Sequence, residues 1–131
     1  MKTAERRSQR KAKCGWNSLL NKILRFRDAR DWEQFHTPKN LSVAIAVEAA
    51  ELQEHFLWQT DAEAKTALGD PKKREKVAEE LADVIIFALL LADSLDLDVD
   101  RIVRKKLKQN ARKYPVKKSK GNHRKYSEFS G

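Results

Sequence analysis

Apolar residues recur every three or four positions along most of the chain, which is the period of an amphipathic helix. The first such segment covers residues 16–36 and ends before Pro38, because the residue that precedes a proline disfavours helical geometry. The same period predicts a second helix over residues 41–58, with Asn40 as its N-cap.

Two further helices follow a polar connection over residues 60–69, which has room for one helical turn. Asp70 is a suitable N-cap for a helix over residues 71–93, whose first residue is a proline. The later half of this helix is apolar on nearly all sides, so it must be buried on every side. In a chain of 131 residues this predicts a subunit interface. Asp98 is a suitable cap for a fourth, mostly basic helix over residues 99–113.

These elements predict an all-α chain built as a bundle of four main helices. The 4 glycines and 3 prolines are few for an all-β protein, which needs many tight turns. We expect a flexible basic leader over residues 1–13, a helical domain over residues 14–116 and a basic C-terminal tail over residues 117–131. The longest apolar run, residues 84–92, is too short to cross a bilayer, so no membrane association is expected.

Charge is distributed unevenly, with two basic ends around an acidic centre. The formal net charge is +9, made up of +5 in residues 1–13, −7 in residues 14–100 and +11 in residues 101–131. Basic ends are compatible with solvated tails, with nucleic-acid contact, or with a C-terminal segment that holds a phosphorylated small molecule. The acidic centre argues against nucleic acid as a partner, because it would repel a polyphosphate. A single cysteine, Cys14, excludes an internal disulfide and favours a reducing, cytoplasmic location.

Four carboxylates form two pairs on the predicted helices. Glu48 and Glu51 are three residues apart on the second helix, and Glu80 and Asp83 are three apart on the third, so each pair shares a face. Such pairs also arise by chance on solvated faces. Here, however, Glu48 and Asp83 interrupt apolar runs, and a buried carboxylate must be protonated, paired or bound to metal. Four converging carboxylates would suit Mg²⁺ or Mn²⁺.

Two other metal chemistries fit these pairs less well. Zinc is disfavoured because neither pair includes cysteine or histidine. Carboxylate di-iron bundles need Glu-x-x-His on two helices. Here the third position after Glu48 is Glu51, and after Glu80 it is Asp83.

Glu48-x-x-Glu51, followed after 28 residues by Glu80-x-x-Asp83, resembles the signature of the MazG-like all-α nucleoside triphosphate pyrophosphohydrolases. Other segments resemble the dCTP pyrophosphatase branch of that family, and the resemblance covers residues 16–126. These segments are Arg30-Asp-Trp-Glu-Gln-Phe-His36 with Pro38-Lys-Asn-Leu41, Glu51-Leu-x-Glu-x-Phe-x-Trp58, Asn110-Ala-Arg-Lys-Tyr-Pro115 and Arg124-Lys-Tyr126.

The resemblance implies a subunit of the all-α NTP pyrophosphatase type in a cytosolic homo-oligomer, either a dimer or a tetramer. It implies Mg²⁺-dependent hydrolysis of a nucleoside or deoxynucleoside triphosphate, with dCTP or modified dCTP expected, to the monophosphate and pyrophosphate. Glu48, Glu51, Glu80 and Asp83 would hold Mg²⁺, with Mn²⁺ as a substitute. Either Glu48 or Glu51 would serve as the general base that accepts a proton from water.

The resemblance also implies substrate contacts. Trp32, His36 and Trp58 would line a base pocket, although aromatic residues at helix ends are also ordinary core residues. Phe87 stands where a tyrosine is expected in vertebrate relatives, so one polar contact is missing. Glu54 and His55 are expected at the surface beside the site. Further contacts to phosphate or sugar are implied for polar residues near the C-terminus, although these also fit a solvated basic face: Lys106, Asn110, Arg112, Tyr114 and Lys125.

Two other classes of function remain open at this point. One is a nucleic-acid-associated helical protein that binds through its basic ends and whose affinity falls steeply with salt. The other is a structural oligomer that keeps the fold without activity, against which the intact set of four acids argues.

Overall fold

The computed structural model describes residues 15–129, and all regular elements in this part of the chain are helical. The prediction of an all-α chain is therefore confirmed. The predicted leader over residues 1–13 and Cys14 lie outside the described residues. The elements are α2 (Gly15–Asp28), the 3₁₀ helix η1 (Glu33–Phe35), α3 (Pro38–Glu54), α4 (Asp61–Ala67), α5 (Pro71–Ser94), α6 (Val99–Lys113), α7 (Val116–Ser119) and the 3₁₀ helix η2 (Tyr126–Glu128).

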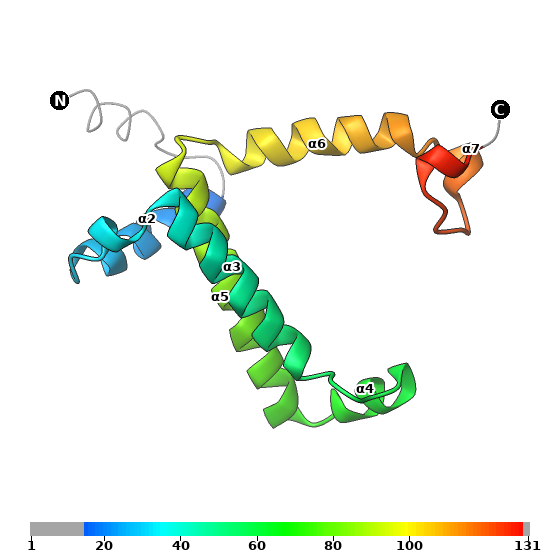
Figure 1. Cartoon of the computed structure of the whole chain (residues 1–131), viewed down its shortest axis with the longest axis horizontal. Coiled ribbons are helices and arrows are strands. Elements are labelled where there is room, and N and C mark those ends of the chain that lie inside the picture. The colour runs from blue at the N-terminus through cyan, green and yellow to red at the C-terminus, as the bar shows by residue number, and fades with distance from the viewer. Residues whose placement is uncertain (1–14, 130–131) are drawn as a thin grey trace. The chain divides into compact units, whose positions relative to one another are not determined.

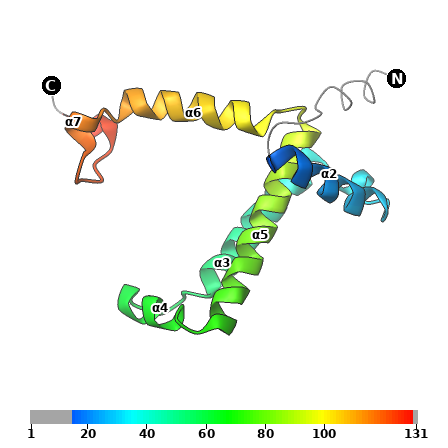
Figure 2. The same ribbon diagram turned by 180° about the vertical axis from the view of Figure 1, so that it is seen from behind.

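The described part of the chain divides into two units, with the boundary between Leu97 and Asp98. Within the first unit, α3 and α5 run antiparallel and lie side by side along their length (Figure 1). Helix α2 packs on α5, and the opposite view shows the same arrangement (Figure 2). The buried apolar residues come from these three helices: Leu20, Ile23, Leu24, Leu41, Leu89, Leu90 and Ala92.

Helix α3 begins three residues earlier than predicted, and its N-cap is Thr37, not Asn40. The Thr37 hydroxyl accepts a hydrogen bond from the Asn40 backbone N–H at 3.2 Å. Pro38 occupies the first helical position, where its missing N–H costs nothing because that group has no partner within the helix. The Asn40 side chain instead donates to the Phe35 carbonyl oxygen at 3.0 Å. The proline that was predicted to end the preceding helix therefore starts this one.

Two helix ends also differ from the prediction. Helix α2 ends at Asp28, well before residue 36, and Asp31 adopts a left-handed backbone with φ 53°. Helix α3 ends at Glu54, before Trp58, whose φ of 63° is also left-handed. A left-handed residue cannot continue a right-handed helix. The amphipathic period therefore extends past the point at which the backbone leaves helical geometry.

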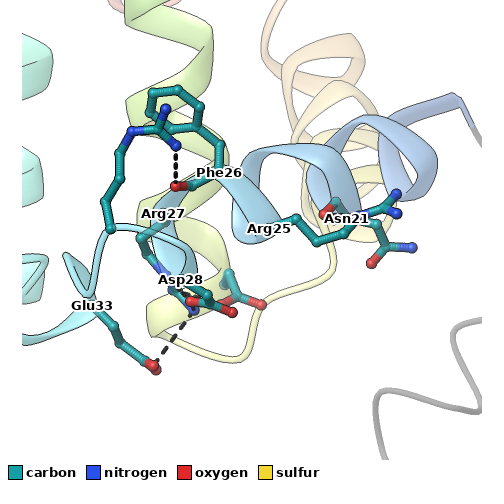
Figure 3. A network of polar contacts seen from close by, with 8 residues as sticks. Asn21, Arg25, Phe26, Arg27, Asp28 and Glu33 are labelled. Carbon is teal, nitrogen blue, oxygen red and sulfur yellow. Dashed lines mark hydrogen bonds and ion pairs between the residues drawn. The ribbon is translucent and has the colours of Figure 1, made fainter.

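Buried Arg27 holds together the end of α2 and the loop after it (Figure 3). Its Nε donates to Asp28 Oδ1 at 2.8 Å, and its guanidinium lies 3.6 Å from Glu33 Oε2. The Arg27 carbonyl oxygen accepts from the Trp32 backbone N–H at 3.2 Å. On α5, the Asp93 carboxylate lies 3.7 Å from the same guanidinium. This arginine therefore fixes the turn that carries Trp32.

The connection between α3 and α5 contains the helical turn for which the sequence left room. Helix α4 begins with a capping box, in which Thr60 and Glu63 satisfy each other's backbone N–H groups. Helix α5 begins as predicted, since Asp70 accepts from the Lys72 backbone N–H at 3.1 Å. The long helix that carries two of the four acids therefore has a well-defined start.

In the second unit, Asp98 caps α6 as predicted, by accepting from the Arg101 backbone N–H at 3.0 Å. Beyond α6 the chain turns back on itself. The Tyr114 ring lies 5.9 Å from that of Tyr126 and 6.1 Å from that of Phe129, both nearly perpendicular to it. No helix among residues 15–129 has the length and apolarity needed to span a membrane.

Candidate functional site

Three carboxylates from the two long helices converge at their interface. Glu48 lies on α3, and Glu80 and Asp83 lie one turn apart on α5. Each residue contributes one carboxylate oxygen, and these three oxygens all lie within 4.8 Å of one another. All three residues are partly buried. Because α3 and α5 pack side by side, residues 32 positions apart in the sequence, Glu48 and Glu80, become neighbours.

The electrostatics of this cluster favour a bound cation. The pKa of Glu48 lies above its ordinary value, because burial disfavours its charged form and its side chain hydrogen-bonds with Glu51. The negative charges of Glu51, Asp83 and Glu80 add to this rise. Three carboxylate oxygens in one small space are the donor set that a hard divalent ion such as Mg²⁺ or Mn²⁺ prefers. Glu48, Glu80 and Asp83 therefore fit such an ion.

Glu51 occupies the edge of the cluster. It lies one turn beyond Glu48 on α3 and is exposed, and it is not among the three converging acids. Its carboxylate nevertheless interacts with that of Glu48. The structure thus separates the four predicted acids into three that converge and one beside them with access to solvent.

An aromatic group lies next to the carboxylates on α5. The His36 ring centroid is 6.4 Å from that of Trp32 and 6.4 Å from that of Phe87. Phe87 follows Asp83 by one helical turn, so the two share a face of α5. The structure therefore brings the predicted pocket residues Trp32 and His36 together. Phe87 links this pair to the carboxylates, because it lies near His36 and one turn from Asp83 on α5.

His36 has an unusual environment within this group. Its Nδ1 atom is buried and has no hydrogen-bond partner among the described residues. Burial lowers the pKa of His36, and the positive charge of Arg27 lowers it further. His36 is therefore held as a neutral imidazole, which can offer one donor and one acceptor.

Trp58 does not join this aromatic group within one chain. It lies beyond the C-terminal end of α3, whereas His36 lies before its N-terminal end. The 17 residues of α3 separate the two by about 25 Å. Trp58 is 93% exposed and has a left-handed backbone, which is uncommon for a bulky residue. A pocket that includes both residues would need a second copy of the chain.

The remaining predicted contacts belong to the second unit. Lys106, Asn110 and Arg112 lie on α6, and Lys106 and Asn110 are one turn apart. Tyr114 is the C-cap of α6, and Lys125 precedes η2. Their role in substrate binding stays a prediction.

Two residues beside the carboxylates were missed or misjudged from the sequence. His55, expected at the surface, is half-buried, and its Nε2 lies 3.8 Å from Glu80 Oε1. Its Nδ1 lies 3.3 Å from Lys73 Nζ. The signal in the sequence was weak: His55 follows Glu48 by seven residues and Lys73 precedes Glu80 by seven, so each pair shares a helix face.

Comparison with known proteins agrees with this geometry. A model of the MazG-like family matches residues 43–129. Over 104 residues, the chain is 43% identical to dCTP pyrophosphatase 1 of Rattus norvegicus and 41% identical to the protein of that name from Homo sapiens. Each match covers 79% of this chain but only 61% of the relative, so the chain spans about three fifths of those proteins.

Among solved structures, the chain is similar to the crystal structure of a pyrophosphatase from Archaeoglobus fulgidus. The TM-score is 0.73 and the sequence identity 39%. The match covers 79% of this chain and 95% of the other.

Proposed function

The chain belongs to the MazG-like family, and on that basis we propose that it hydrolyses a nucleoside or deoxynucleoside triphosphate to the monophosphate and pyrophosphate. The observation that carries the proposal is the convergence of Glu48, Glu80 and Asp83 at the α3–α5 interface. The relatives named dCTP pyrophosphatase 1 favour dCTP or a modified dCTP as substrate. Removal of such nucleotides would cleanse the nucleotide pool, and we place this activity in the cytoplasm, where that pool is found.

The chain's own carboxylates would perform two tasks. Glu48, Glu80 and Asp83 would hold Mg²⁺, or Mn²⁺ in its place, because their oxygens already converge. When bound, the cation would neutralise the charge of the triphosphate and polarise its phosphorus–oxygen bonds. A carboxylate at the edge of the cluster would accept a proton from the attacking water. The exposure of Glu51 to solvent supports Glu51 in this role, and Glu48 is the alternative.

The aromatic group would bind the base. Trp32 is 42% exposed, so its ring offers a surface on which a base can stack. Neutral His36 would offer its Nε2 atom to a base edge, since Nδ1 is buried, and Phe87 offers no hydroxyl there. The phosphates of a nucleotide held by this group would point along α5 toward Asp83, one turn away. Lys106, Asn110, Arg112, Tyr114 and Lys125 are the candidates for further phosphate or sugar contacts.

A homo-oligomer, a dimer or a tetramer, would complete both the core and the pocket. Val43 and Val47 lie one turn apart on α3 and are 53% and 49% exposed, and Leu81 on α5 is 48% exposed. Such apolar faces on paired helices are typical of subunit interfaces. Because α3 keeps Trp58 away from His36 in one chain, we place Trp58 of a second copy in the pocket.

The direct test is a panel of separate hydrolysis reactions with the four dNTPs, the four NTPs and 5-methyl-dCTP. Each is run with Mg²⁺ and with EDTA, and the products are separated. We expect monophosphate plus pyrophosphate with Mg²⁺ and none with EDTA. Glu51→Gln should abolish turnover with little loss of folding. Orthophosphate as product, or hydrolysis that survives EDTA, would contradict the proposal.

A further inference from the structure

His55 connects a lysine to one of the three converging carboxylates. It is the C-cap residue of α3, whereas Lys73 and Glu80 lie on α5. Lys73 Nζ lies 3.3 Å from His55 Nδ1, and His55 Nε2 lies 3.8 Å from Glu80 Oε1. The side chain of His55 is only 18% exposed to solvent, and that of Glu80 only 25%. The two helices therefore enclose a Lys73–His55–Glu80 chain of polar groups, which we call the triad.

The chemistry of these partners determines the state of the imidazole ring. A lysine ammonium group has only donors, so Lys73 must donate to His55 Nδ1. Nδ1 then carries the lone pair, and in a neutral ring the hydrogen is on Nε2. This N–H lies beside the Glu80 carboxylate at 3.8 Å, which is longer than a hydrogen bond, so it attracts the carboxylate as a dipole attracts a charge. With the hydrogen on Nδ1 instead, the Nδ1–H donor would lie against the Lys73 ammonium group, which is also a donor, and the contact would be unfavourable.

We propose that His55, with its tautomer held by Lys73, is a positioning residue that orients the Glu80 carboxylate toward Glu48 and Asp83. This inference rests on the proposed metal site. His55 touches neither substrate nor cation in this role and acts only through Glu80. Polar groups beside metal ligands commonly help to orient those ligands, and their loss weakens metal binding. Because Lys73 and His55 come from different helices, the triad also makes this orientation depend on α3–α5 packing.

The first experiment measures the tautomer of His55 in the metal-free protein. The ring nitrogens are observed by ¹⁵N NMR at about pH 8.5, and His55→Leu identifies the resonances. We expect the Nε2–H tautomer in the wild-type chain. Lys73→Met should shift it toward a mixture, whereas Lys76→Met, at an exposed lysine of the same helix, should leave it unchanged. An Nδ1–H tautomer, or no response to Lys73→Met, would overturn the proposal.

The second experiment measures Mn²⁺ binding by electron paramagnetic resonance without any nucleotide. We expect His55→Leu to weaken binding about 10-fold. His55→Gln, which retains an N–H near the position of Nε2, should restore most of the affinity. Lys73→Met should weaken binding less than His55→Leu, and the double variant should be no weaker than His55→Leu alone. Circular dichroism verifies that each variant is folded.

The outcomes separate this inference from the proposed function. If the wild-type chain does not bind Mn²⁺, or if Glu80→Gln binds it equally well, the metal site itself is wrong and the inference falls with it. If the wild-type chain binds Mn²⁺ and folded His55→Leu binds it with the same affinity, only the positioning role of His55 is overturned.

Discussion

The guanidinium of Arg27 lies 3.7 Å from the carboxylate of Asp93, which joins the end of α2 to the last turns of α5. Arg27 is only 4% exposed, although a charged residue at that depth is unusual. Its charge is compensated by carboxylates that themselves reach solvent, namely Asp28, Glu33 and Asp93. The same arginine lies close enough to lower the pKa of His36, so this contact also bears on the candidate base pocket.

Replacing Arg27 by methionine should therefore destabilise the chain. The hydrogen bonds to charged partners would be lost while the apolar stem is kept, so we expect a loss of about 2 kcal/mol in the free energy of unfolding. Urea denaturation followed by circular dichroism measures this loss. The matched control is Arg25→Met on the exposed side of α2, which should change stability by less than about 0.5 kcal/mol. Equal effects of the two substitutions would mean that the buried contact contributes nothing.

Glu48→Gln should stabilise the chain in EDTA at neutral pH. The pKa of Glu48 is raised in the folded state, so the folded protein binds the proton more tightly than the unfolded chain. Stability is therefore lost as pH rises from the ordinary pKa of 4.5 through the raised folded value, and glutamine removes this penalty. We expect a higher Tm than wild type near pH 7, and no gain well below pH 4.5.

The same variant should no longer respond to divalent ions. Mn²⁺ should raise the Tm of the wild-type chain, because a ligand that binds only the folded state stabilises it. It should leave the Tm of Glu48→Gln nearly unchanged. Glu54→Gln, which changes an exposed acid of α3, is the control and should behave like wild type in both measurements. An equal Mn²⁺ response in Glu48→Gln would remove Glu48 from the metal site.

His36 should make stability depend on pH in the opposite direction. Its folded pKa lies below 6.5, so as pH falls below 6.5 the unfolded chain takes up a proton that the folded chain resists. The free energy of unfolding should therefore decrease over this interval and level off below the folded pKa. Glutamine does not titrate in this range, so the free energy of unfolding of His36→Gln should fall less between pH 7 and pH 5 than that of the wild-type chain. Parallel pH profiles for the two proteins would show that His36 is not held neutral.

Trp58→Ala should weaken substrate binding more than it slows turnover. An aromatic stacking contact contributes about 1–3 kcal/mol, so KM should rise about 5- to 150-fold while kcat changes little. Steady-state kinetics with the best nucleotide of the panel measures both constants. Leu57→Ala, at a neighbouring residue that is 57% exposed, is the control and should leave KM near its wild-type value. An unchanged KM for Trp58→Ala would exclude Trp58 from the pocket.

Mixed oligomers should show whether Trp58 acts in a second copy. Glu51→Gln subunits carry an intact Trp58, and Trp58→Ala subunits carry intact carboxylates. If each site combines residues of two copies, co-refolded mixtures should regain hydrolysis with wild-type KM at a fraction of the sites. If Trp58 served the site of its own chain, no mixture would contain a complete site and the low KM would not return.

Local sequence signals predicted most of the fold. Asp70 and Asp98 cap their helices as expected, because an N-cap depends on residues within one turn of it. The start of α3 was misplaced because Asn40 was taken as its N-cap, whereas the backbone geometry makes Thr37, three residues earlier, the cap. The ends of α2 and α3 were misplaced because left-handed residues leave no trace in the apolar period.

The sequence by itself determined that the chain is helical and that its four candidate acids form two pairs, because helix period and i, i+3 spacing are local properties. Only the tertiary structure decided which acids converge. It set Glu51 at the edge, placed His55 between Lys73 and Glu80, and separated Trp58 from His36 by the length of α3. These relationships depend on the register at which α3 packs against α5, and that register follows from the burial of both helices together.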